Sequence, residues 1–138
     1  MKVFLDTNFL LDAIVARDNP KFTRDAATIL SLGENGTVEL YMSVISIPTI
    51  AYVLKNISPS AKKTLIRELV EIVKTLPSLP EHVANILEGP INDIEDALQV
   101  QSAVEGGCDV IVTRNLPDFR FSGIPAISPD DFLCRILE

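Results

Sequence analysis

The sequence contains no tryptophan, one histidine and only two cysteines among its 138 residues. Cys108 and Cys134 are too few for a disulfide framework or for a thiolate metal cage. The lone histidine, His82, excludes the histidine clusters that favour zinc, and we expect it on the surface near the start of a helix. Any metal site must therefore use oxygen ligands, and the scarcity of cysteine favours a reducing, cytoplasmic setting.

Long apolar runs are also absent. Asp6, Asp12 and Arg17 interrupt the apolar N-terminal segment, so neither a membrane span nor a secretory leader is expected there. Hydrophobic residues make up 47% of the chain and charged residues 22%, which is typical of a packed globular protein. No linker or repeat divides the sequence, and we expect residues 1–138 to form one domain.

Positive charge is scarce, and the formal net charge is -7. Proteins that coat nucleic acid are usually basic, because phosphate neutralisation supplies much of their affinity. An acidic chain can still act on nucleic acid when metal ions at a carboxylate cluster face the phosphates, or it can bind a basic protein. The charge argues against broad DNA or RNA coating and leaves catalysis open.

Short apolar strands alternate with helical patterns along the whole chain. Asp18-Asn19-Pro20 and Ser58-Pro59 are typical turn-and-cap sequences, and Ser46 is a predicted cap with Pro48 in the first helical turn. This alternation predicts an α/β fold with a parallel sheet covered on both faces. We expect strands at residues 2–5, 38–42, 75–79, 109–113 and 125–127, and helices at residues 8–15, 20–32, 46–55, 81–87, 93–105 and 129–137, with a further helix beginning at Ser58-Pro59.

The first candidate for a functional site is Asp6. The apolar run from Val3 to Leu5 predicts a buried parallel strand, and Asp6 follows it directly. Ligands bind at the carboxyl ends of the strands in open α/β sheets, and an acid at that position is not explained by core packing.

The helix predicted at residues 93–105 carries two more acids. Asn92 and Glu95 have the spacing of a capping box at its start. At 100° per residue, Asp93 and Asp96 continue an apolar stripe, where charged side chains are unexpected. For Asp93, an interaction with the helix dipole is an equally good explanation, whereas for Asp96 we favour a site. The stripe contains Asp93, Asp96, Ala97, Val100, Ala103 and Val104, and the opposite face contains Glu95, Gln99 and Ser102.

A third group of polar residues follows the strand at residues 109–113. Thr113, Asn115 and Asp118 should emerge at the same sheet edge as Asp6, although Asp118 after Pro117 is alone explained as a turn residue. Carboxylates that converge repel one another and need a cation. Oxygen ligands favour Mg²⁺ or Mn²⁺, which can activate water against a phosphodiester.

These segments resemble the PIN domain, the fold of VapC-type toxin ribonucleases. The resemblance is carried by Asp6-Thr7-Asn8, Asp96-Ala97-Leu98 and the segment from Val112 to Phe119, in the family's order and spacing. It implies a three-layer α/β/α sandwich with a central, mostly parallel five-stranded sheet. It also implies a Mg²⁺- or Mn²⁺-dependent endoribonuclease that acts on RNA and pairs with a small antitoxin protein, with a homodimer as a further arrangement to test.

The resemblance also assigns roles to residues. Asp6, Asp96 and Asp118 would be the catalytic metal ligands, assisted by Asn115 and Asp93. The remaining site residues would orient the carboxylates or the phosphate through hydrogen bonds: Thr7, Asn8, Ser46 and Thr113.

Two positions depart from the family pattern. Thr49 stands where the family usually has a glutamate in the helix after the second strand, and Asn115 stands where it often has an acid. Replacing glutamate by threonine removes a charge and shortens the reach, so one metal position should weaken, and Asp93 is placed to compensate.

Three alternatives remain. A degenerate PIN domain would bind RNA or a protein without cleavage, which Thr49, Asn115 and the acidic charge favour. A haloacid-dehalogenase-like phosphatase needs a second acid where Asn8 stands, so we discount it. A structural α/β interaction module would give Asp6 and Asp96 no purpose, and burial of Asp6 beside other carboxylates would exclude it.

Overall fold

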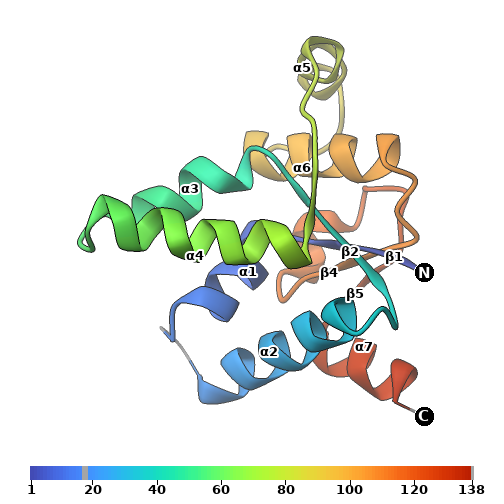
Figure 1. Cartoon of the computed structure of the whole chain (residues 1–138). Helices are drawn as coiled ribbons and strands as arrows, with labels where there is room; N and C mark the ends of the chain where they lie inside the picture. Colours follow the sequence, from blue (N-terminus) through green and yellow to red (C-terminus); the bar gives the residue numbers. More distant parts are fainter. Residues whose placement is uncertain (17–18, 138) are drawn as a thin grey trace.

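A computed structural model describes residues 1–16 and 19–137, and its described part contains a five-stranded sheet (Figure 1). The strand order is β3-β2-β1-β4-β5, and every neighbouring pair is parallel. The predicted α/β fold with a mostly parallel five-stranded sheet is therefore confirmed. The strands are β1 (Lys2–Leu5), β2 (Glu39–Ser43), β3 (Lys74–Leu76), β4 (Val110–Val112) and β5 (Ala126–Ile127).

Helices cover both faces of this sheet (Figure 1). Side chains of β1 alternate between two cores: Val3 and Leu5 pack with Phe9 of the first helix, and Phe4 packs with Val100 of the sixth. A strand that is buried on both faces has a continuous apolar sequence, as residues 3–5 have. The helices are α1 (Thr7–Ile14), α2 (Pro20–Glu34), α3 (Ser46–Val53), α4 (Pro59–Ile72), α5 (Pro80–Leu87), α6 (Ile94–Glu105) and α7 (Pro129–Ile136), with a 3₁₀ turn η1 (Leu116–Phe119).

The predicted helix starts are confirmed to within about one residue, but two predicted caps are wrong. Asn19 and Ser58 cap α2 and α4 through their side chains, although Asp18 of the predicted turn lies outside the described residues. Ser46 does not cap α3, because its hydroxyl is buried against Thr7. The helix α6 is capped by Asp93, whose Oδ1 accepts the Asp96 N–H at 2.9 Å, and not by the predicted capping box.

His82 is not a surface residue. It is 3% exposed at the start of α5, where its Nδ1 accepts a hydrogen bond from the Leu79 N–H at 3.1 Å. This bond satisfies one of the free N–H groups at the helix start, a role that side-chain periodicity does not reveal.

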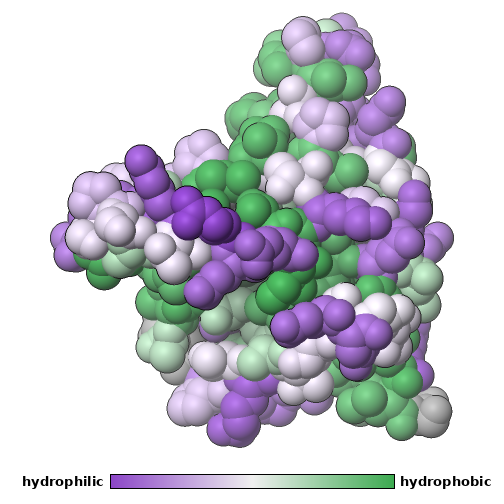
Figure 2. All heavy atoms as spheres, viewed as in Figure 1, coloured by the Kyte–Doolittle hydropathy of each residue, from purple (hydrophilic) through white to green (hydrophobic). Residues whose placement is uncertain are grey.

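The surface mixes hydrophilic and apolar groups (Figure 2). Apolar side chains are visible around α5, the helix at the top of Figure 1, where Val83 and Leu87 are exposed. In the part of the chain that the structure describes, no helix is both long enough and apolar enough to cross a membrane.

Candidate active site

Three separate segments bring carboxylates into one pocket at the carboxyl edge of the sheet. Asp6 follows β1, Asp96 lies in the first turn of α6, and Asp118 lies in η1. The cavity measures about 190 Å³, several times the volume of about 30 Å³ that one water occupies in the liquid. We call it the carboxylate pocket, and it is lined by Asp6, Thr7, Asn8, Thr49, Asp93, Glu95, Asp96, Gln99 and Asp118.

Asp6 is held from both sides. It is 2% exposed, its Oδ1 accepts the Phe9 N–H at 2.8 Å as the cap of α1, and its Oδ2 accepts the Thr113 hydroxyl at 2.6 Å. Burial raises the pKa of Asp6 from 3.8 to about 6, although both hydrogen bonds act in the opposite direction. A carboxyl group buried beside other acids is the outcome that excludes the structural-module alternative, even though Asp6 also has a capping role.

Asp96 lies among the other acids. Burial, followed by repulsion from the carboxylates of Asp93 and Asp118, raises the pKa of Asp96 from 3.8 to about 7. Asp6 and Glu95 add to this repulsion. The negative charge that accumulates in the carboxylate pocket would be relieved by a bound cation.

A buried hydrogen-bond chain fixes the floor of this pocket. Gln99 is 1% exposed, and its Oε1 accepts both the N–H of Thr7 at 2.9 Å and the Thr7 hydroxyl at 3.2 Å. The hydroxyls of Thr7 and Ser46 are 2.7 Å apart, and Gln99 Nε2 lies 3.5 Å from Asp96 Oδ1. These hydrogen bonds therefore connect α3 and α1 to Gln99 of α6, and through Gln99 to the carboxylate of Asp96.

The face of α6 opposite the apolar stripe is polar but does not face solvent. Gln99 and Ser102 are buried, and the Ser102 hydroxyl donates to the Pro77 carbonyl at 3.1 Å, whereas Val104 is exposed. The reason is that α6 packs against β2 on one side and against α5 on the other, so a single apolar stripe does not describe its buried surface.

Glu95, on the face of α6 opposite the apolar stripe, is a pocket residue that the sequence pattern does not identify. It lines the carboxylate pocket, and its Oε1 accepts the Thr49 hydroxyl at 3.5 Å. A carboxylate from α6 thus lies beside Thr49, the residue for which the resemblance predicts a glutamate in the family pattern. The only signal in the sequence is that Glu95 directly precedes Asp96.

Asn115 is not among the residues that line the carboxylate pocket. Its backbone N–H donates to the Thr113 hydroxyl oxygen at 2.9 Å, which helps to orient Thr113 towards Asp6. Asp93 and Asn8 do line the pocket, and Asp93 combines this position with its role as the cap of α6.

The donor set suits a hard divalent cation. Five carboxylates line the pocket, but among the described residues no three His, Cys, Asp or Glu side chains lie close enough together to hold a metal ion by themselves. Mg²⁺ keeps several waters and typically binds one or two carboxylates together with a substrate phosphate. An open, oxygen-only pocket of this size fits a hydrated ion of that kind.

A parallel sheet with carboxylates gathered at its carboxyl edge is the architecture expected of a PIN domain. The PIN domain family model matches residues 2–117, and the chain belongs to this family. Ribonuclease VapC1 of Aquifex aeolicus is 31% identical over 140 residues, which cover 97% of this chain and 94% of that protein.

Two solved structures share the fold at low sequence identity. VapBC2 from Rickettsia felis, bound to a DNA fragment from its promoter, matches with a TM-score of 0.66 and 17% identity over 93% of this chain and 98% of that chain. VapBC-1 from nontypeable Haemophilus influenzae matches with a TM-score of 0.66 and 20% identity over 94% and 99% of the two chains.

The contacts of Asp6 predict how two substitutions differ. Asp6→Asn keeps an acceptor for the Phe9 N–H and removes a buried charge, so the metal-free protein should be equally stable or slightly more stable at pH 8. Asp6→Ala loses both hydrogen bonds, which should lower the free energy of unfolding by about 1–2 kcal/mol. Urea denaturation in EDTA measures both. A loss of several kcal/mol in Asp6→Asn would mark Asp6 as a structural residue only.

Proposed function

We propose that this chain is a metal-dependent endoribonuclease, the toxin of a toxin–antitoxin pair, that cleaves RNA phosphodiester bonds with an activated water. The observation that carries the proposal is the convergence of Asp6, Asp96 and Asp118 in one pocket where burial and mutual repulsion raise carboxyl pKa values. The 31% identity to a protein named Ribonuclease VapC1 supports the choice of RNA as substrate.

Asp6, Asp96 and Asp118 would hold a hydrated Mg²⁺ or Mn²⁺ together with a substrate phosphate, one or two of them by direct contact, with Glu95 and Asp93 nearby. The ion supplies Lewis acidity, which stabilises charge on the phosphate and favours ionisation of water. The chain's own part is positioning. Thr113 holds Asp6, and Gln99 holds Thr7, so the pocket is ordered before substrate binds.

An antitoxin partner is part of the proposal. VapBC2 from Rickettsia felis and VapBC-1 from Haemophilus influenzae are the named structural neighbours, and both names denote a VapB–VapC pair. With a net charge of -7, this chain should favour a partner that presents basic side chains. A homodimer and a cytoplasmic location remain predictions.

The second candidate is a degenerate PIN domain that binds RNA or a protein without cutting. Thr49 in place of the usual glutamate favours it, and so does the absence of Asn115 from the pocket lining. Incubating nuclease-free protein with single-stranded and structured RNAs in Mn²⁺, Mg²⁺ or EDTA separates the two. The enzyme predicts cleavage that EDTA abolishes, and the degenerate domain predicts binding with intact RNA.

Because Thr49 and Glu95 are in contact, we expect a carboxylate at position 49 to compensate for the loss of the one at position 95. Thr49→Glu adds a charge to the pocket and should raise Mn²⁺ affinity about three- to tenfold, because ligand charge strengthens hard-cation sites. Glu95→Gln should lower affinity by a similar factor, and the double variant should return near the original value. Calorimetric titration measures each affinity.

A matched control tests whether the added charge must lie in the carboxylate pocket to affect Mn²⁺ affinity. Thr64→Glu adds the same charge at an exposed position on α4, and it should leave Mn²⁺ affinity unchanged. Equal affinities in Thr49→Glu and the unmodified protein would show that the family alignment of Thr49 is wrong.

A further inference from the structure

A second hollow opens directly from the carboxylate pocket. It measures about 270 Å³ and shares Asp93, Asp96 and Asp118 with its neighbour. We call it the adjoining pocket. Its other lining residues are of a different kind, since they are mostly apolar or aromatic, with one cation: Pro90, Ile91, Asn92, Pro117, Arg120 and Phe121.

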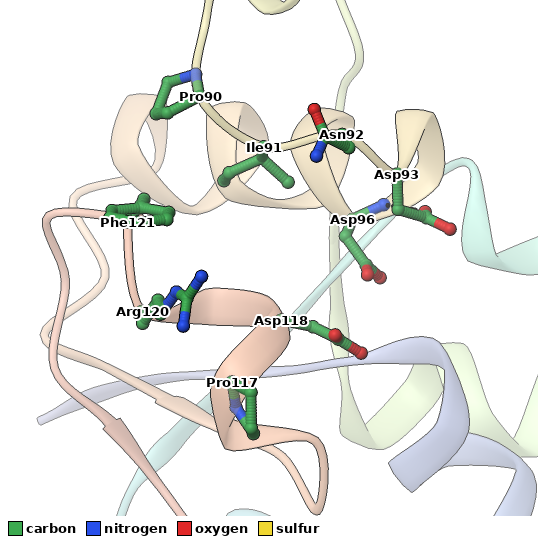
Figure 3. A pocket seen from close by; sticks show the side chains of 9 residues that line it. All are labelled: Pro90, Ile91, Asn92, Asp93, Asp96, Pro117, Asp118, Arg120 and Phe121. Atoms are coloured by element: carbon green, nitrogen blue, oxygen red, sulfur yellow. Dashed lines mark hydrogen bonds between the residues drawn. The ribbon is translucent and has the colours of Figure 1, made fainter.

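The two kinds of side chain occupy opposite sides of the adjoining pocket (Figure 3). The carboxylates of Asp93, Asp96 and Asp118 gather on one side, and Arg120 and Phe121 lie on the other. A ligand that spans this pocket would therefore meet acids at one end and a guanidinium with an aromatic ring at the other.

Arg120 is the only cation among the described residues that line either pocket. No described carboxylate forms a salt bridge with it, and its guanidinium carbon lies 4.7 Å from the centre of the Phe121 ring. In a chain of net charge -7, a guanidinium this close to the candidate active site is well placed to bind an anionic group such as phosphate.

Phe121 is 57% exposed, which is unusual for a large aromatic side chain. The segment that carries it is nevertheless anchored on both sides. Phe119 is 1% exposed in the core, and the Ser122 hydroxyl donates to the Ile124 carbonyl at 2.7 Å and accepts the Ile124 N–H at 3.1 Å. The backbone that carries the ring is thus held in place across the adjoining pocket from the carboxylates, so little backbone entropy is lost when a ligand binds there.

We propose that Arg120 and Phe121 form a nucleotide-binding subsite for single-stranded RNA. The Phe121 ring stacks on an unpaired base next to the phosphodiester at the carboxylate pocket, and Arg120 pairs with a neighbouring phosphate. Aromatic rings stack on bases of any identity, but only on bases that are not already paired and stacked in a duplex. The subsite rests on the proposed function and specifies its substrate as RNA with unpaired nucleotides.

The test measures RNA binding without cleavage. The full-length protein carrying Asp96→Asn is titrated into a fluorescein-labelled single-stranded RNA hexamer in Mn²⁺, and fluorescence anisotropy gives the Kd. Adding Phe121→Leu should raise the Kd about tenfold, because the stacking of a base on the aromatic ring is lost. Phe121→Tyr should stay within about twofold, since it keeps the ring. Arg120→Gln should raise the Kd about fivefold and weaken its salt dependence.

Matched controls remove an exposed ring and a cation elsewhere. Tyr52→Leu and Arg67→Gln lie on α3 and α4, outside both pockets, and should bind the hexamer as the parent does. If Phe121→Leu binds as tightly as the parent, or if Phe121→Tyr loses as much as Phe121→Leu, the subsite is overturned. Either result leaves cleavage by the unmodified protein untouched. If that protein neither binds nor cleaves the hexamer, the proposed function fails, and the subsite fails with it.

Discussion

Asp96→Asn is expected to abolish metal-dependent RNA cleavage, lowering kcat/KM at least about 100-fold. The carboxylate of Asp96 lines both the carboxylate pocket and the adjoining pocket, and burial together with repulsion from four other acids raises its pKa. Removing one ligand from a hard-cation site weakens both ion binding and the activation of water, so a single change should be nearly silencing. Asp6→Asn should have the same effect on cleavage.

The control for this prediction removes a charge from the same helix. Glu105 is exposed at the far end of α6, and Glu105→Gln should leave kcat/KM unchanged. Thermal unfolding of each variant, expected at the temperature of the unmodified protein or slightly above for Asp96→Asn, shows that the fold is intact. Cleavage that persists at full rate in Asp96→Asn would contradict the assignment of the site or indicate a contaminating nuclease.

The metal-free protein is expected to lose stability as the pH rises from about 4 to 8. Asp6 and Asp96 have folded-state pKa values of about 6 and about 7, against 3.8 for the ordinary side chain. Between the unfolded-state pKa of 3.8 and these folded-state pKa values, the folded protein binds more protons than the unfolded protein. The free energy of unfolding therefore falls as the pH increases through this range. Asp6 accounts for a change on the order of 2–3 kcal/mol, and the less buried Asp96 for a smaller one.

Urea denaturation in EDTA at several pH values measures this slope. The variant carrying both Asp6→Asn and Asp96→Asn is the reference, and its profile should be flatter over the same range. Saturating Mn²⁺ should stabilise the unmodified protein more at pH 8 than at pH 5, because protons and the ion compete for the same carboxylates. Equal slopes in the two proteins would show that burial and mutual repulsion do not raise the pKa values of Asp6 and Asp96.

The sheet could be predicted from sequence because its strands are buried on both faces. Residues 3–5 form an unbroken apolar run, since Val3 and Leu5 face one core and Phe4 the other. Several helices also begin at N-cap residues that can be recognised in the sequence, such as Ser58, whose side chain accepts the Ala61 N–H at 3.1 Å. Asp6 could be singled out for the same local reason, because it directly follows one of these strands.

The parts that could not be predicted depend on contacts between distant segments. In the sequence, Gln99 has the character of a solvent-facing residue. In the structure its side chain accepts a hydrogen bond from the Thr7 N–H of α1, and Thr7 is 92 positions away in the sequence. Glu95 lines the carboxylate pocket, where it meets the Thr49 hydroxyl of α3, 46 positions away in the sequence. A helical wheel describes one buried stripe, whereas α6 is covered by β2 and by α5. Polar side chains buried by tertiary contacts leave no periodic pattern of their own.

The most direct test of the central claim is the dependence of RNA cleavage on Mn²⁺ concentration, measured beside calorimetric Mn²⁺ binding on the same nuclease-free protein. A metal-dependent ribonuclease predicts that the cleavage rate rises from zero in EDTA and reaches half its maximum near the calorimetric Kd, since the ion at the carboxylate pocket is the one that supports cleavage. Saturable Mn²⁺ binding with no cleavage of single-stranded RNA at any concentration would contradict it and leave the degenerate binding domain.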